Sequence, residues 1–314
     1  MEHFTRIQFS MQNSPLIKKR NSLIEFYRFV FAINVVKNHG FFPYKGKLFG
    51  PENLSVEFFF ILSGWFIRSS FDKYINLPYF KGLFLMLKHK LVALGIPLLI
   101  SLILWIPYRC LVESDVILGY LWFIHDMFVV FIFYYTIRKI VRNEKVFFGI
   151  TALLFIAASI FHAIPQFYSN GWFRAISAMS LGILISYIPS IKLKHQWLLY
   201  IPLVFVWLYI GRMLFFDYSF IEEEILNLAV FPALIYLTFQ LSFHNRVLNY
   251  LGGISFGLYA YQHVPRLMRV LNIGNEWIYF VTVLGLAILT DLVMRIIRYL
   301  KIKKQQDQNI IETA

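Results

Sequence analysis

Long apolar stretches alternate with short polar segments along almost the whole chain. Each stretch has the length that a helix needs to cross a bilayer core about 30 Å thick, roughly 20 residues. Backbone groups in lipid must be hydrogen-bonded within their own segment, so we expect helices. The pattern predicts an all-α integral membrane protein, a bundle of about ten transmembrane helices, with one span fewer or more as the alternatives. The expected spans are 23–41, 53–70, 91–108, 119–137, 146–163, 172–189, 197–214, 225–243, 252–271 and 277–297.

Composition supports a membrane protein. The 314 residues are 59% hydrophobic and 15% charged, against roughly 25% charged in an ordinary soluble domain. The net charge of +13 is unevenly placed, because most Lys and Arg fall in segments that lie inside when the N-terminus is inside. Acidic residues gather in the expected outer loops. This is the positive-inside asymmetry, so we expect both termini to be cytoplasmic and no nucleic-acid partner.

The domain organisation follows from the spans. A cytoplasmic N-terminal segment is expected at 1–20, one transmembrane domain at 21–298, and a cytoplasmic polar tail, which we expect to be disordered, at 299–314. Cys110 is the only cysteine, which excludes an internal disulfide framework and a cysteine-based metal site. No metal is expected, and the transmembrane domain has to contain the whole activity.

Two ionisable residues in the first expected span need an explanation. Arg28 and His39 are eleven residues apart, which places them within about 20° of one helix face and about 16 Å apart along the axis. Such groups are costly in a membrane and usually face a polar cavity or the bundle interior. The alternative is that Arg28 extends to the membrane surface and His39 is an ordinary interfacial histidine.

Neighbouring segments add to this polar stripe. Glu57 lies near the outer end of the second span, and Arg68 lies at its inner end. A carboxylate among phenylalanines is expensive unless it is paired or protonated, and Glu57 is either part of a site or a structural partner for an Arg or Tyr. Lys88 and Lys90 precede the third span and form either a phosphate-binding lip or a topology signal.

These segments resemble the membrane-bound acyltransferase 3 family over approximately residues 20–298. The likeness rests on Arg28 with ten residues before His39, followed in order by VEFFFILSGWFI (56–67), FLMLKHKLVALGIP (84–97), YLWFIHDMF (120–128) and LGGISFGLYAYQHVP (251–265). The resemblance implies a bacterial inner-membrane O-acyltransferase that moves an acyl group, most often acetyl, from cytoplasmic acyl-CoA to a hydroxyl of a cell-envelope glycan. Two features depart from the family: its usual arginines are replaced at Lys88 and Lys90, and we expect no fused extracytoplasmic esterase-like domain, which many members carry.

The polar stripe suits this chemistry, because acyl-CoA carries a charged nucleotide far from its thioester. Arg28, with Arg68, Lys88 and Lys90, is expected to bind its phosphates, although lysine lacks the planar fork of arginine. His39 is expected to act as general base on the acceptor hydroxyl, or to be acylated transiently. Glu57 is expected to orient and polarise His39.

Residues later in the chain are weaker candidates for acceptor binding. Trp122, His125 and Asp126 lie near the outer end of the fourth span, where Trp122 is equally typical of an interfacial belt. Tyr259 and His263 recur with Ser255 every four residues and are expected to form one helical stripe, which is also typical of interhelical hydrogen bonding. We interpret Arg174 and Asp291, two further intramembrane ionisable groups, as structural.

The sequence therefore predicts a multi-pass enzyme of the bacterial cytoplasmic membrane, surrounded by lipid, that carries out O-acetylation of a cell-surface polysaccharide or of its lipid-linked precursor. The main alternative is a transporter or flippase for a glycan precursor, since spans broken by Gly and Pro and lined by a polar stripe also describe carriers. A relative that only scaffolds an envelope complex is a third possibility.

Overall fold

A computed structural model describes residues 21–38, 52–112, 122–164, 171–216 without 192 and 194, and 220–313. Throughout these ranges the chain is helical, with turns and short connections and no strand. The elements are α1 (Ser22–Asn38), α2 (Glu52–Tyr74), α3 (Tyr79–Val112), α4 (Trp122–Ile140), α5 (Glu144–Ala163), α6 (Gly171–Ile185), η2 (Gln196–Leu199), α7 (Tyr200–Phe215), α8 (Phe220–Ile225), η3 (Leu226–Val230), α9 (Phe231–Gln240), α10 (Arg246–Ala260), α11 (Val264–Val270) and α12 (Glu276–Thr313).

The all-α fold class is confirmed, and each expected span contains helix. By length and composition, three helical stretches among the described residues suffice to cross a membrane: Glu144–Ala163, Gln196–Met213 and Glu276–Ile297. A fourth is added if the two halves of α3, Tyr79–Val92 and Leu94–Ile106, which are bent by 60°, count as one span. The structure thus supports a membrane protein, while the larger number of spans and the orientation of the termini stay predictions.

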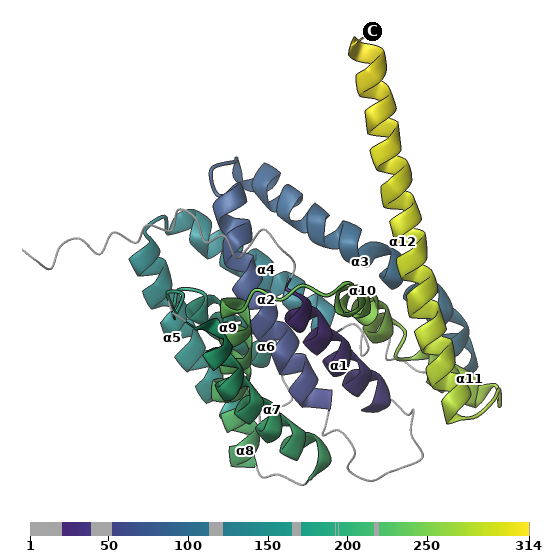
Figure 1. The fold of residues 1–314 in the computed structure, drawn as a ribbon, viewed down its shortest axis with the longest axis horizontal. Helices are drawn as coiled ribbons and strands as arrows, with labels where there is room; N and C mark the ends of the chain where they lie inside the picture. The colour runs from purple at the N-terminus through teal and green to yellow at the C-terminus, as the bar shows by residue number, and fades with distance from the viewer. Residues whose placement is uncertain are drawn as a thin grey trace, which may run out of the picture.

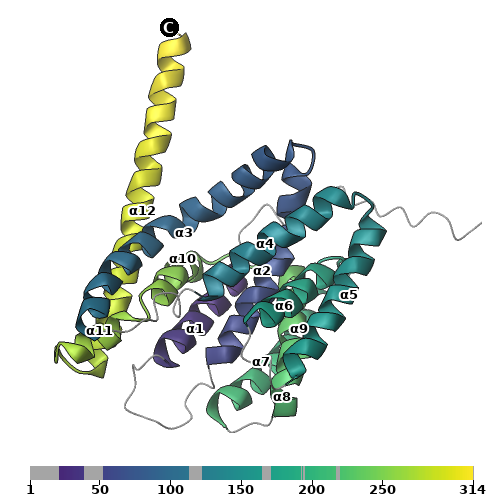
Figure 2. The same cartoon turned by 180° about the vertical axis from the view of Figure 1, so that it is seen from behind.

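Two helices differ from the expectation. α3 begins at Tyr79, twelve residues before the expected span, because the basic segment around Lys88 is helical and belongs to the same element. α12 continues through the polar tail to Thr313, so the expectation of a disordered tail is wrong. In Figure 1 the end of α12 projects away from the bundle, and Figure 2 shows α3 crossing the upper part of the view from α2 toward α11 and α12.

α2 and α6 pack closely through a pair of glycines. A Cβ on Gly64 of α2 would collide with the backbone of Met179, and a Cβ on Gly182 of α6 would collide with the carbonyl oxygen of Ile61. Small residues of this kind let helix backbones approach within a membrane. Gly64, part of the FFFILSG segment, therefore has a packing role that fixes α2 against α6.

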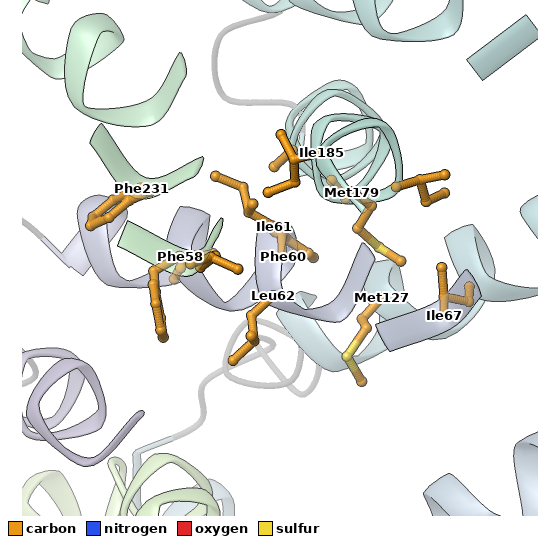
Figure 3. Packing of buried hydrophobic residues seen from close by; sticks show 14 of the residues in the cluster. Phe58, Phe60, Ile61, Leu62, Ile67, Met127, Met179, Ile185 and Phe231 are labelled. Carbon is orange, nitrogen blue, oxygen red and sulfur yellow. The ribbon is translucent and has the colours of Figure 1, made fainter. Parts of the chain in front are cut away.

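The main core surrounds α2. Figure 3 shows Phe58 and Phe60 of α2 among buried side chains of its neighbours, including Met127 of α4, Met179 of α6 and Phe231 of α9. In contrast, α5 turns large apolar side chains outward, which fits a face in contact with lipid tails; these are Val146, Phe148, Leu153, Ile156, Ile160 and Phe161.

The beginning of α1 is fixed to the connection between α9 and α10. The Asn21 side chain donates to the carbonyl oxygens of Thr238 and Leu241, each at 2.9 Å. Ser22 Oγ accepts a hydrogen bond from the Asn245 backbone N–H at 2.7 Å. Because these bonds hold the first turn of α1, the helix that carries Arg28 starts from a defined position.

Candidate active site

The expected pair of Arg28 and His39 is described only in part. His39 lies outside the described residues, directly after Asn38, the last residue of α1. Arg28 lies in the second turn of α1 and forms an ion pair with Glu25 at 2.9 Å. Its side chain keeps 30% of its surface exposed, so the guanidinium has room for a further ligand.

A second cation lies near Arg28. Lys90 of α3 interacts electrostatically with Arg28, and its ammonium lies 5.2 Å from the ring centroid of Phe131. Two like charges repel one another, and an anion bound between them offsets this repulsion. Of the four residues expected to bind phosphate, Arg28 and Lys90 are the two that the structure places within electrostatic reach of each other.

The other two lie elsewhere. Arg68 is 8% exposed, and its guanidinium lies 3.6 Å from the ring centroid of Tyr187 and donates to the Ser186 carbonyl at 2.8 Å. Glu144 of α5 lies 4.0 Å from Arg68 and 3.6 Å from Arg138. These contacts join the C-terminal parts of α2 and α4, the start of α5 and the segment after α6. They give Arg68 a structural explanation, and its role in binding phosphate stays a prediction.

Lys88 is on the surface of α3. Its ammonium lies 6.0 Å from the ring centroid of Phe84, one turn earlier. This is the geometry of a side chain lying along its own helix, and it distinguishes Lys88 from Lys90 two residues later.

Glu57 is paired within the bundle. Its carboxylate oxygen Oε1 accepts a hydrogen bond from Arg174 Nε at 2.5 Å, across 117 residues of sequence. The two side chains are only 6% and 10% exposed. The pair joins α2 to α6, and it agrees with the structural alternative in which Glu57 pairs with an arginine.

The contacts between α1 and α2 set the depth of Glu57. The rings of Phe31 and Phe58 are 4.4 Å apart, and Asn34 donates to Ser55 Oγ at 2.8 Å, so the two helices are antiparallel. Glu57 therefore lies level with about residue 32, roughly one turn from Arg28 and two turns short of the position after Asn38. Contact with His39 requires the chain after Asn38 to return toward α2, and the orientation of His39 by Glu57 stays a prediction.

Two more carboxylates lie close to Arg174. Burial raises the pKa of Glu223, and the positive charge of Arg174 opposes this rise. Burial, and then the charge of Glu223, raise the pKa of Glu224, again against Arg174. Both residues belong to α8, in the expected outer loop. Sequence reasoning counted them only as outer charges, because nothing in a stretch of acidic residues shows that a distant arginine faces it.

The expected acceptor residues of α4 lie against the start of α6. Asp126 and Trp122 are directly beside Gly171, the first residue of α6. His125 is exposed and Asp126 is buried, but His125 Nδ1 still donates to Asp126 Oδ1 at 3.0 Å. The His125 ring also lies edge-on to Trp172, with centroids 5.2 Å apart. The structure thus brings together the three predicted residues and adds Trp172, and sugar contact stays a prediction.

The expected stripe of Ser255, Tyr259 and His263 is wrong in its geometry. α10 ends at Ala260, and His263 lies in a turn before α11. Pro265, near the start of α11, has no backbone N–H to continue the helix. All three stripe residues are buried, and Ser255 Oγ donates to the Gly252 carbonyl at 2.8 Å. Tyr259 and His263 stay predicted acceptor residues, but they do not share one helix face.

No group of three or more His, Cys, Asp or Glu side chains within the described ranges has the arrangement of a metal site.

The fold and the site together define a class: a helical protein of membrane type, with buried ionisable side chains at different depths of its central helix α2. The family comparison then identifies it. The model of the acyltransferase domain of the acyltransferase 3 family matches residues 22–294, so the chain belongs to this family and is an acyltransferase. This confirms the resemblance seen in the sequence. Neither the curated proteins nor the solved structures compared with the chain contain a match.

Proposed function

We propose that this acyltransferase is an O-acyltransferase of the bacterial cytoplasmic membrane. It moves an acyl group, acetyl in the simplest case, from cytoplasmic acyl-CoA to a hydroxyl of a cell-surface polysaccharide or of its lipid-linked precursor. The observation that carries the proposal is the setting of Arg28 on α1, the helix whose last described residue precedes His39. The Arg28 side chain pairs with Glu25 at 2.9 Å, is 30% exposed and has Lys90 of α3 within electrostatic range.

Arg28 and Lys90 supply the charge that a phosphate needs. Hydrogen bonds between charged groups are shorter and roughly twice as strong as neutral ones, and an anion between the two cations would relieve their repulsion. Glu25, which pairs with Arg28, holds the guanidinium in place from the preceding turn of α1. We therefore assign the diphosphate of the donor to this position.

His39 is the proposed base. An imidazole titrates near neutral pH, so it accepts the proton of the acceptor hydroxyl as the oxygen attacks the thioester carbonyl. CoA leaves as a thiolate with the electron pair of the broken C–S bond and takes up the proton that His39 accepted, which restores the neutral imidazole. An acyl-histidine intermediate gives the same products in two steps, and Glu57 is the carboxylate proposed to favour the charged imidazole.

The proposal is tested with purified protein, radiolabelled acetyl-CoA and envelope glycan from cells that lack the gene. We expect label on the glycan, and we expect His39→Ala to lower the rate by roughly 100- to 10,000-fold, the usual contribution of a general base. His195→Ala is the matched control, because His195 lies in an exposed connection before η2; its rate should equal that of the unchanged protein.

Full labelling by His39→Ala would show that the assignment is wrong. Transport of unmodified glycan without acetyl-CoA, with no label transferred, would support the flippase alternative. Mass spectrometry of the envelope polysaccharide with and without the gene gives both the added mass and the molecule that carries it.

A further inference from the structure

The Arg174 guanidinium is hydrogen-bonded to one carboxylate and lies within electrostatic range of two more, from two other helices. Glu57 of α2 accepts its Nε–H at 2.5 Å, and Glu223 and Glu224 of α8 interact with it electrostatically. A guanidinium does not lose its proton in proteins. One permanent positive charge therefore faces up to three negative charges, and the carboxylates compete for it.

Burial makes this competition matter for Glu57. The side chains of Glu57 and Arg174 are 6% and 10% exposed, so water can solvate neither charge well. A carboxylate in such a place takes up a proton unless a paired cation compensates for the lost hydration. The ionisation of Glu57 therefore depends on Arg174.

Other ionisable groups surround the pair, among the residues that the structure describes. His162 of α5 interacts electrostatically with Arg174. Asp126 of α4, hydrogen-bonded to His125, lies beside Gly171, one turn before Arg174. On α1, Arg28 lies about one turn from the level of Glu57. Among the described residues, Arg174 is the cation bonded to Glu57, and the carboxylates that interact electrostatically with Glu57 are Glu223 and Glu224.

We propose that Arg174 is a positioning residue that holds Glu57 as a carboxylate in a fixed direction, and that Glu223 and Glu224 weaken this hold by competing for the same guanidinium. The inference rests on the proposed function, in which Glu57 acts as a carboxylate. It gives Arg174 a part in the reaction that a purely structural link between α2 and α6 does not have.

The test is the pH dependence of the initial rate, measured on the full-length protein with radiolabelled acetyl-CoA and envelope glycan. Arg174→Gln removes the charge and keeps a polar side chain. We expect the acid limb of the profile to move up by about one pH unit or more, the usual effect of losing an adjacent opposite charge. Arg174→Lys keeps the charge, so its acid limb should stay in place even where the geometry lowers the maximum rate.

Two further proteins separate positioning from folding. With Arg174 in place, the double variant Glu223→Gln and Glu224→Gln removes the competing carboxylates, and we expect the acid limb to move toward lower pH. Arg212→Gln is the matched control: Arg212 also pairs with a glutamate of α8, Glu222, but its side chain is 46% exposed. Its profile should match that of the unchanged protein.

The outcomes distinguish this inference from the proposed function. A uniform loss of rate in Arg174→Gln without movement of the acid limb would overturn the positioning role. A double variant of Glu223 and Glu224 whose limb coincides with that of the unchanged protein would overturn the competition by these two carboxylates. In either case, loss of activity in His39→Ala would leave the acyl transfer itself supported. Full activity of His39→Ala would instead contradict the proposed function, whatever the Arg174 variants show.

Discussion

Gly64→Ala tests how far the close contact between α2 and α6 determines the stability of the bundle. The added Cβ would lie 2.9 Å from the Cα and the carbonyl carbon of Met179, whereas ordinary contacts begin at 3.4 Å. These neighbours are backbone atoms, which cannot move away by changing rotamer. The carbonyl oxygen of Met179 would be closer still, so the two helices have to separate by more than about 0.5 Å, or the core around α2 has to shift.

A second glycine supplies the reference. Gly149 of α5 is also helical, but a Cβ there would meet nothing within 4 Å. Both substitutions replace Gly by Ala inside a helix, so the gain in helix propensity, up to about 1 kcal/mol, is common to both. The difference between the two variants is then the steric cost, which we expect to be about 1–3 kcal/mol for overpacking.

Thermal unfolding in one detergent, followed by tryptophan fluorescence, measures this difference. At roughly 2–4 °C per kcal/mol, we expect Gly64→Ala to melt several degrees below Gly149→Ala. Adding Gly182→Ala to Gly64→Ala should cost less than the sum of the single changes, because one separation of the helices relieves both collisions. Equal melting temperatures for Gly64→Ala and Gly149→Ala would refute the reasoning.

Three other changes address the charged residues. Arg28→Gln should raise the KM for acetyl-CoA by roughly 10- to 100-fold, the value of hydrogen bonds to a charged group, while Lys81→Gln, at an exposed position of α3, should leave it unchanged. Arg68→Met should lower the melting temperature without changing the KM for acetyl-CoA, because Arg68 contacts Ser186 and Tyr187. A raised KM with an unchanged melting temperature would instead show that Arg68 binds acetyl-CoA. Burial raises the pKa of Glu223 above 4.5. Its contribution to stability is therefore complete below about pH 4.5 and is lost as the pH rises through the raised pKa. Glu223→Gln should make the fall in melting temperature with rising pH less steep, and an equally steep fall would contradict this.

The positions of the helices were largely predictable, because a helix that crosses a bilayer needs about 20 consecutive apolar residues, and such a stretch is visible in the local sequence. An apolar stretch of spanning length needs no partner to be recognised. Prediction failed where polar residues extend a helix beyond its apolar part. The sequence predicts that Lys88 and Lys90 precede a span, but they are inside α3, and the residues after 297 continue α12. In both cases the helix continues beyond its apolar part, because basic and glutamine side chains also have a high helix propensity.

The sequence predicted which residues belong to the candidate site, but it did not predict how they contact one another. Buried charge in an apolar span identified Arg28 and Glu57, and the order of motifs identified the family. The partner of Glu57 was not predictable, because Arg174 is 117 residues away and no local spacing connects them. The break before His263 was also missed, although Pro265 was a visible signal for it.

α2 and α6, the two helices that meet at Gly64, are also joined by a polar contact on each side of this glycine. Glu57 is bonded to Arg174 at a separation of 117 residues, and Arg68 to Ser186 at a separation of 118. Nearly equal separations mean that α2 and α6 run parallel and stay in register over the eleven residues from Glu57 to Arg68. These residues span about 16 Å of helix, and the glycine contact lies between the two bonds. A shift of α6 along α2 would therefore break both polar contacts together, so the close packing at Gly64 sets the position of Glu57 as well as the stability of the core.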